Sequence, residues 1–245
     1  MIDLAKIKNH TLSHEPYDWA SIDNLYSPAD AAELAATYPS DCFKTVKGYD
    51  GEKGYSYEAR CLIGMGSSTA AFPQGLSAAW RQLADDLLSP GYREAMSKLT
   101  GCDLSRLIIE ANVFHFGPGA WLGPHVDLKE KVVTHVLYFN KSWERENGGC
   151  LAILRSSDMA DEVAEILPTV GNCSVIVRSN KSWHAVKRVK QDFHESRRSV
   201  TVTFYPPGSV STMWPPNDKA PLHNYDEKPQ TAGTLGRLKG WFSGH

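Results

Sequence analysis

Paired cysteines are missing from this sequence. Its five cysteines are odd in number, are scattered along the chain and never have a CxxC spacing. Such usage indicates neither a disulfide framework nor a thiolate zinc site. It is typical of a protein in a reducing compartment, so we expect a cytoplasmic location.

The sequence also lacks long apolar runs and a strong excess of one charge. No stretch approaches the ~20 apolar residues of a membrane-spanning helix, and the first residues lack the apolar core of a signal peptide. Its 26 basic and 28 acidic residues give a formal net charge of −2, which attracts neither nucleic acid nor an anionic membrane. We therefore expect no nucleic-acid or membrane partner. The sequence leaves the oligomeric state open.

Length and composition are those of an ordinary globular protein. The 245 residues are 42% hydrophobic and 22% charged, and they contain no internal repeat or low-complexity tract. This is enough material for one large domain with its own core. We expect a single domain over residues 1–245. It would comprise a strand and helices that support the core and select the substrate (1–104), a β-rich core (105–205) and a wrapping tail or lid (206–245).

The secondary-structure pattern changes at Ser105. Before it, "DWASIDNLY" (18–26) predicts an early strand, and "SPADAAELAATYP" (27–39) predicts a helix with a serine N-cap and a proline in its first turn. Two further helices are predicted between Ala71 and Thr100. After Ser105, six short strands alternate with turns, and only "DMADEVAEIL" (158–167) predicts a helix. The fold class is therefore mainly β with flanking helices (α+β), an antiparallel sandwich or barrel.

His125 and Asp127, in "GPHVDLKE" (123–130), are the first candidate ligands of a metal. Residues i and i+2 of an extended chain point to the same side, so both side chains would face inward. Such a pair is a weak signal by itself, because a polar loop explains it equally well. One more histidine would complete the two-histidine, one-carboxylate triad that leaves three positions open on iron(II).

His184 is the best candidate for that third ligand, since "SWHAVKRV" (182–189) alternates like a strand. Three other histidines fit less well: His115, His135 and His194. Downstream, Arg197 and Ser199 again have the i, i+2 spacing, which places a guanidinium and a hydroxyl on one face of a strand. Such a pair can hold a carboxylate bidentately. A surface arginine on an edge strand remains the simpler alternative for Arg197 alone.

The motifs taken together resemble the iron(II)- and 2-oxoglutarate-dependent dioxygenases. The order His-x-Asp, distant His and Arg-x-Ser carries the resemblance. Within that superfamily, "ANVFHFGPGAWLGPHVD" (111–127) and "VVTHVLYFNKSWERENGGCLAIL" (132–154) look like the prolyl-4-hydroxylase-like branch. The likeness covers about residues 105–205. It implies a double-stranded β-helix (jelly-roll, cupin-like) core with the N-terminal helices packed on the major sheet.

The resemblance also implies a role for each matched residue. His125, Asp127 and His184 would bind iron(II) and form the catalytic centre, and Arg197 would bind the distal carboxylate of 2-oxoglutarate. Tyr138 would hydrogen-bond that carboxylate. Two neighbours complete the co-substrate pocket: Thr134 and Ser199. Dioxygen is the second co-substrate, and ascorbate is an optional stimulant.

The chain departs from the branch at Phe116, where a tyrosine is usual, so a hydroxyl contact from that position is not expected. Substrate selection is expected in "KGYDGEKGYSYEARC" (47–61) and around the cavity mouth. The candidate substrate residues are Lys53, Tyr55, Arg60, His115 and Trp121. A solvated polar loop is an equally good explanation of residues 47–61.

The expected activity is hydroxylation of an unactivated C–H bond, with succinate and CO₂ as co-products. Relatives that halogenate have lost the carboxylate ligand, so the presence of Asp127 favours hydroxylation. We expect a small metabolite as substrate, such as an amino acid, a sugar or a natural-product intermediate. The alternatives are a protein prolyl hydroxylase acting on a peptide and a non-catalytic metal-binding jelly-roll module.

Overall fold

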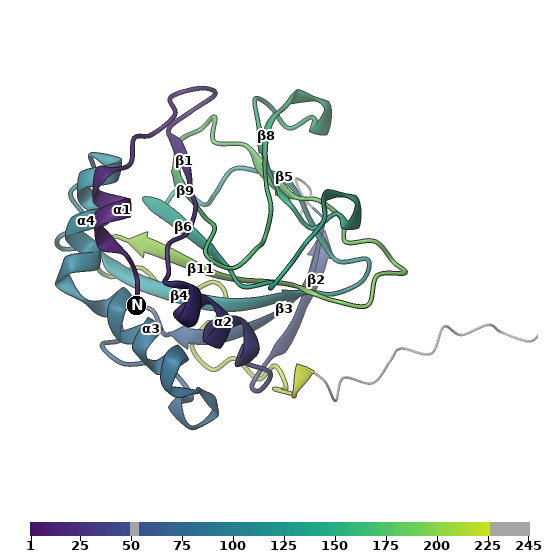
Figure 1. The fold of residues 1–245 in the computed structure, drawn as a ribbon, viewed down its shortest axis with the longest axis horizontal. Helices are drawn as coiled ribbons and strands as arrows, with labels where there is room; N and C mark the ends of the chain where they lie inside the picture. The colour runs from purple at the N-terminus through teal and green to yellow at the C-terminus, as the bar shows by residue number, and fades with distance from the viewer. Residues whose placement is uncertain (50–53, 226–245) are drawn as a thin grey trace, which may run out of the picture.

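Eleven strands, all within residues 1–49 and 54–225 that this computed structural model describes, form one curved sheet. The order is β1-β9-β6-β11-β4-β3-β5-β10-β7-β8, with β2 paired to β3. The strands are β1 (Trp19–Ile22), β2 (Lys44–Tyr49), β3 (Gly54–Ile63), β4 (Ile108–Phe116), β5 (Trp121–His125), β6 (Val133–Tyr138), β7 (Leu151–Leu154), β8 (Glu162–Ile166), β9 (Cys173–Val177), β10 (His184–Val186) and β11 (Arg197–Tyr205). The sheet curls into a nearly closed barrel (Figure 1), and the expected jelly-roll core is confirmed.

Four α-helices of the described residues support this sheet: α1 (Leu4–Asn9), α2 (Pro28–Ala36), α3 (Ala78–Leu88) and α4 (Pro90–Thr100). Serine side chains cap three of them. Ser27 accepts from Asp30 N at the start of α2, and Ser89 both ends α3 and caps α4. Gly101 ends α4 with a φ of 69°, which a residue with a side chain rarely adopts. The three helices predicted before Ser105 are thus confirmed, and the short α1 was not predicted.

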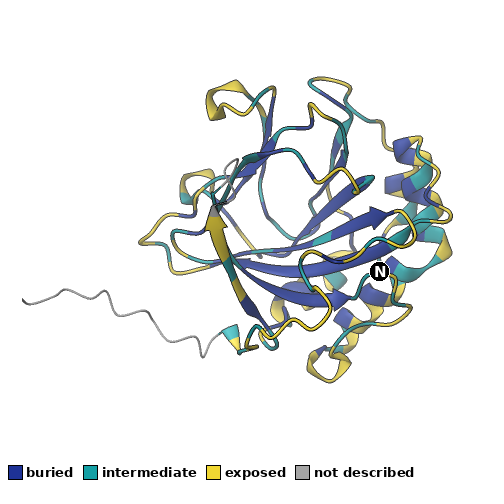
Figure 2. Ribbon diagram, turned by 180° about the vertical axis from the view of Figure 1, so that it is seen from behind, coloured by how far each residue is buried: buried dark blue, intermediate teal, exposed yellow. Residues whose placement is uncertain are grey.

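The two faces of the major sheet have different neighbours, as β11 illustrates. Val200, Val202 and Phe204 belong to the apolar core that includes Trp80, Leu83 and Met96 of the helices. The helices cover this face, and the strands β5, β10, β7 and β8 curl over the other (Figure 1). The alternate residues from Arg197 to Tyr205 line a cavity inside the barrel. Strand alternation therefore separates a packing face from a chemical face, and the sheet that divides them is largely buried (Figure 2).

Residues 158–167 do not form the predicted helix. They form a short 3₁₀ turn, Met159–Asp161, followed by β8. Leu151, Ala152 and Ile153 of β7 pair with Ile166, Glu165 and Ala164. Pairing with the exposed edge of β7 satisfies the backbone of this segment, and this tertiary interaction overrides its weak helical pattern.

Residues 47–49 and 54–61 are not a solvated loop. They belong to β2 and β3, which pair from Lys44↔Ala59 to Tyr49↔Gly54. Within the expected tail, residues 206–225 lie beside the start of β2, where Phe43 and His223 form a β-bridge. We call residues 211–220 the strap. The rest of the expected tail, residues 226–245, lies outside the described residues.

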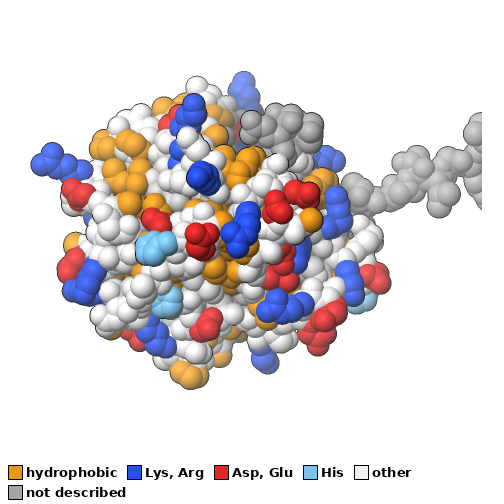
Figure 3. Space-filling model, turned by 90° about the horizontal axis from the view of Figure 1, so that it is seen from above, with side chains coloured by type: hydrophobic (Ala, Val, Ile, Leu, Met, Phe, Trp, Pro, Cys, Tyr) orange, Lys and Arg blue, Asp and Glu red, His pale blue; other side chains and the backbone are white. Residues whose placement is uncertain are grey.

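None of the helices in the described residues combines the length and the apolar character that a membrane span requires. On the face shown in Figure 3, basic and acidic side chains are interspersed.

Candidate metal centre and co-substrate pocket

His125 and His184 lie directly opposite each other in neighbouring antiparallel strands. His125 is the last residue of β5, His184 is the first residue of β10, and the two are register partners. Their ring centroids are 4.3 Å apart. Because directly opposed residues of an antiparallel pair project to the same face, this register brings together two side chains that are distant in the sequence.

Backbone carbonyls fix the orientation of both imidazoles. His125 Nδ1 donates to the carbonyl oxygen of Gly123 and His184 Nδ1 to that of Ser182, each at 2.9 Å. A carbonyl only accepts, so Nδ1 carries a proton in each ring and Nε2 is the nitrogen left to bind a metal. Histidines that bind a metal usually donate their other ring N–H to an acceptor in this way.

Asp127 is held as an ionised carboxylate. Lys131 donates to Oδ1 at 2.6 Å and Thr134 donates to Oδ2 at 2.7 Å. Burial alone would raise the pKa of this carboxyl, but the charge of Lys131 and the two nearby histidines hold it well below its usual range. The carboxylate is thus charged, buried and fixed by two donors.

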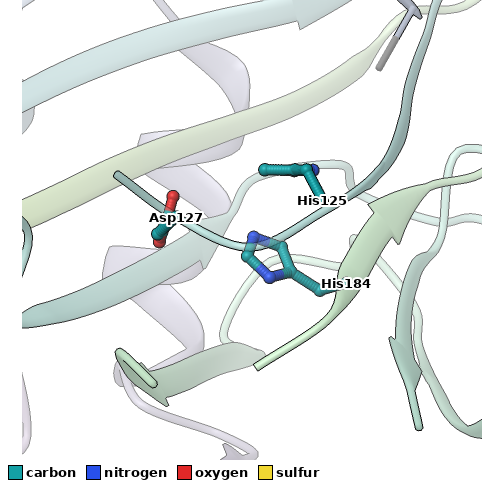
Figure 4. Close-up of side chains that lie close together, drawn as sticks. All are labelled: His125, Asp127 and His184. Atoms are coloured by element: carbon teal, nitrogen blue, oxygen red, sulfur yellow. The ribbon is translucent and has the colours of Figure 1, made fainter. Parts of the chain in front are cut away.

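The three side chains converge on one point. One ligand atom from each of His125, Asp127 and His184 lies within 4.8 Å of the others, and all three residues are buried. Figure 4 shows the two rings and the carboxylate turned toward a common centre. Two imidazole nitrogens and one hard carboxylate oxygen suit a divalent ion such as iron(II), with coordination positions left for other ligands.

Arg197 forms a buried cationic site in the same cavity. It is 2% exposed, and its Nη1 donates to Ser199 Oγ at 2.7 Å. Its Nε has no hydrogen-bond partner, and no carboxylate of the described residues forms an ion pair with it. Burial lowers the pKa of the guanidinium, although neighbouring tyrosines oppose this. An unpaired buried charge is costly, so the arrangement calls for an anionic ligand. We call Arg197 and Ser199 the anion socket.

A family model of the 2OG-Fe(II) oxygenase superfamily matches residues 111–205. That segment contains every residue of the triad and the anion socket. Residues 111–205 are a 2OG-Fe(II) oxygenase core. Membership implies that iron(II), 2-oxoglutarate and dioxygen take part in its reaction, and the donor set of the triad fits the iron.

Solved structures show the same fold around the oxygenase core. A prolyl-4-hydroxylase from Pseudomonas putida has a TM-score of 0.55 at 20% identity, over 83% of this chain and 98% of that one. A Trichoplax adhaerens prolyl hydroxylase, in complex with a hypoxia inducible factor peptide fragment, has a TM-score of 0.54 at 16% identity, over 76% and 83%. A 2OG-Fe(II) oxygenase family oxidoreductase from Burkholderia pseudomallei has a TM-score of 0.52 at 12% identity, over 74% and 80%. No curated protein sequence matches the chain.

Tyr138 of the oxygenase lies beside the anion socket. Its ring centroid is 5.3 Å from the Arg197 guanidinium carbon, and its hydroxyl is 2.9 Å from Ser174 Oγ. The side chain is fully buried and is not among the residues that line the cavity. Tyr138 thus contacts the Arg197 guanidinium and shares a hydrogen bond with it, and a bond from Tyr138 to the co-substrate stays a prediction.

The predicted substrate residues of the oxygenase do not form one group. Tyr55 lines the cavity, whereas Lys53 lies outside the described residues. Arg60 does not reach the cavity mouth as predicted: it is fully buried, and its guanidinium binds Asp41 and the carbonyl of Phe72. Residue 60 falls on the face of β3 opposite Tyr55, and strand alternation is the reason for the error.

His115 and Trp121 also lie away from the cavity. His115 lies between the cavity-lining Phe114 and Phe116 in β4 and therefore projects to the opposite face. There its ring stacks on Tyr225, with centroids 3.7 Å apart. Trp121 lies under the guanidinium of Arg188, at 3.7 Å. Neither position supports a contact with substrate.

Several cavity residues of the oxygenase were not predicted. Lys131 is one, because the loop between Asp127 and β6 has no sequence signal for its conformation. Glu110 and Asn112 line the cavity from β4. The sequence does contain a pattern that could have predicted them. Two polar residues at i and i+2 in an otherwise apolar strand lie on the same face, which is often a functional one. The strap residues on the cavity are Thr212, Met213, Pro215, Asp218 and Ala220.

Proposed function

We propose that the protein is an iron(II)- and 2-oxoglutarate-dependent hydroxylase that oxidises an unactivated C–H bond of a small metabolite and releases succinate and CO₂. The proposal rests mainly on Arg197. This arginine is buried in the same cavity as the triad, and it has no carboxylate partner among the described residues. A metal that only stabilises the fold needs no anion socket. A dicarboxylic co-substrate needs both a metal and a cation.

In this proposal, His125 and His184 hold the metal through Nε2 and Asp127 through its carboxylate. The bound iron, with 2-oxoglutarate and dioxygen, supplies the oxidising chemistry. Arg197 and Ser199 receive the distal carboxylate and thereby orient the co-substrate. Phe114 and Phe116 line the same end of the cavity and exclude water from it.

The cavity favours a small molecule as substrate. Its volume is about 620 Å³, within the roughly 300–1,000 Å³ that is typical of small-molecule sites. The β2–β3 hairpin and the strap both contribute to its wall, so a peptide would have to share this space with them. A prolyl peptide is the second candidate, because the Trichoplax adhaerens relative is described in complex with a peptide fragment.

The test is anaerobic reconstitution with iron(II) and 2-oxoglutarate, followed by exposure to oxygen in the presence of pooled metabolites or of prolyl peptides. We expect succinate release that metabolites stimulate and peptides do not. Asp127→Ala should abolish turnover, and Arg197→Ala should raise the 2-oxoglutarate concentration needed for half-maximal rate by roughly 100-fold or more.

Arg198→Ala is the matched control. Arg198 is adjacent, but its side chain lies on the opposite side of the sheet, with Nη1 3.4 Å from the carbonyl of Ala35. We expect this variant to keep the wild-type requirement for 2-oxoglutarate. Full succinate production by both Asp127→Ala and Arg197→Ala would reject the proposal, and stimulation by prolyl peptides alone would replace the metabolite with a peptide.

A further inference from the structure

The cavity has two chemically different ends along β11. Register pairs Arg197 with Phe116 and Ser199 with Phe114 of β4, and then Thr201 with Asn112 and Thr203 with Glu110. All of these side chains line the cavity. One end therefore combines the anion socket with aromatic walls, and the other, which we call the polar end, is built from hydroxyl, amide and carboxylate groups.

The triad lies beside the polar end. Thr134, which binds Asp127, is the register partner of Thr203 on β6, and Thr203 is in turn the partner of Glu110 on β4. The anion socket lies further along β11, with Ser199 four residues and Arg197 six residues from Thr203. If 2-oxoglutarate extends from the metal toward Arg197, the space on the other side of the metal is the polar end. A substrate must place its reacting carbon close to the metal, so it occupies that space.

Glu110 is the buried acid of the polar end. It is 4% exposed, and it accepts hydrogen bonds from the Ser211 hydroxyl and from the Asn112 side chain. Among the described residues, no lysine, arginine or histidine forms an ion pair with it. A carboxylate offers about four acceptor positions, so two bonds leave capacity for a further donor. Burial raises the pKa of Glu110, and the two donors oppose this only in part.

The strap fixes the orientation of these donors. Trp214 Nε1 donates to Asn112 Oδ1 at 2.7 Å, so the NH₂ group of Asn112 is the part that faces Glu110. The backbone N–H of Trp214 donates to Ser211 Oγ at 2.8 Å, and the Ser211 proton is thereby directed to Glu110. Lys44 binds the carbonyl of Met213 and the carboxylate of Asp218 and ties the strap to β2. These hydrogen bonds fix the position of the Glu110 carboxylate and leave it able to accept a further hydrogen bond.

We propose that the polar end is the substrate subsite, and that Glu110 there accepts a hydrogen bond from an ammonium or hydroxyl group of a polar small molecule. This inference rests on the proposed function, because it needs the metal and 2-oxoglutarate to occupy the remaining space. The hydroxyls of Thr201, Thr203 and Tyr205 on the same wall provide further hydrogen bonds. An apolar substrate, or a prolyl ring without a donor, would leave these groups unpaired at a cost.

The test measures binding, not turnover. The protein is loaded with Zn(II) and 2-oxoglutarate and titrated by calorimetry with three panels: primary amines, polyols, and molecules of similar size without N–H or O–H groups. We expect ligands from the amine or the polyol panel only, and which of the two panels binds identifies the donor. For such a ligand, Glu110→Gln should raise Kd roughly 10- to 100-fold, and Glu110→Asp should restore part of the loss.

Glu94→Gln, which neutralises an exposed carboxylate on α4, is the control and should leave Kd unchanged. Melting curves establish that each variant is folded. Ligands from the donor-free panel alone, no ligand from any panel, or an unchanged Kd in Glu110→Gln would overturn the inference. Binding of 2-oxoglutarate to the wild type is measured in the same samples. If 2-oxoglutarate binds and Glu110 has no effect, only the subsite is wrong; if it does not bind, the proposed function is wrong.

Discussion

Thr134 donates a hydrogen bond of 2.7 Å to Oδ2 of Asp127. The sequence had suggested Thr134 only as part of the pocket wall, yet its hydroxyl holds the one carboxylate of the triad. Because Thr134 lies inside β6, with partners on both sides in β9 and β11, it is a rigid support. The carboxylate is therefore oriented by the major sheet, whereas the histidines come from β5 and β10.

Thr134→Val should weaken metal binding. Valine keeps the shape and the strand propensity of threonine but removes the donor, so the Asp127 carboxylate can rotate away from the ligand position. Loss of such a supporting bond typically reduces metal affinity by roughly 10- to 100-fold. Anaerobic titration with Fe(II), and with Mn(II) as a stable substitute, measures the change. Thr134→Ser keeps the hydroxyl and should keep most of the affinity, and equal affinities in all three proteins would contradict this role.

The residues that meet at the site were predictable where a short-range pattern sets their direction. The spacing of His125 and Asp127, and of Arg197 and Ser199, places each pair on one side of an extended chain. The structure brings the two histidines together through the register of β5 with β10. No pattern in the sequence specifies that register. The strand-like alternation of residues 182–189 favours His184 over the other histidines, but it does not place His184 opposite His125.

The errors have the same physical origin. The sequence predicts Arg60 at the cavity mouth because basic and aromatic residues cluster there, and the cluster does not reveal that Arg60 lies in a strand. In the strand β3, successive side chains point to opposite faces, so Tyr55 lines the cavity and Arg60 lies on the other face. The roles of Lys131 and Glu110 depend on contacts with a loop and with the strap, which are tertiary interactions.

Lys131→Met should destabilise the protein in the absence of metal. Lys131 is the cationic partner of the buried Asp127 carboxylate, and removal of one partner from a buried ion pair costs about 3 kcal/mol or more. The metal ion replaces the missing charge, so added Mn(II) should raise the melting temperature of the variant by more than that of the wild type. Urea unfolding of the metal-free proteins measures the loss. Lys129→Met, at an exposed neighbouring position, is the control, and equal stability of the two variants would contradict the prediction.

The buried His135 should make stability depend on pH. Burial lowers the pKa of His135 from 6.5 to about 3, and its Nδ1 is 2.8 Å from the Tyr92 hydroxyl. A histidine whose pKa is depressed on folding is neutral in the folded state, so the unfolded state binds more protons below pH 6.5. Its contribution is therefore fully present above pH 6.5 and is lost as the pH falls toward 3, by about 1.4 kcal/mol per pH unit.

The measurement is the free energy of unfolding in urea between pH 7.5 and pH 5, a range in which few carboxylates titrate. His135→Gln can still accept a bond from Tyr92 but does not titrate, so its stability should fall less steeply than that of the wild type below pH 6.5. His194→Gln replaces an exposed loop histidine and is the matched control for the loss of one histidine. The slope of His135→Gln should be smaller than the wild-type slope by the increment for one proton, because one fewer proton is taken up on unfolding. Identical slopes for His135→Gln and the wild type would contradict the prediction, because they would mean that His135 is already protonated in the folded protein. A protonated, buried His135 beside Tyr92 would need a nearby anion, and the described residues place none there.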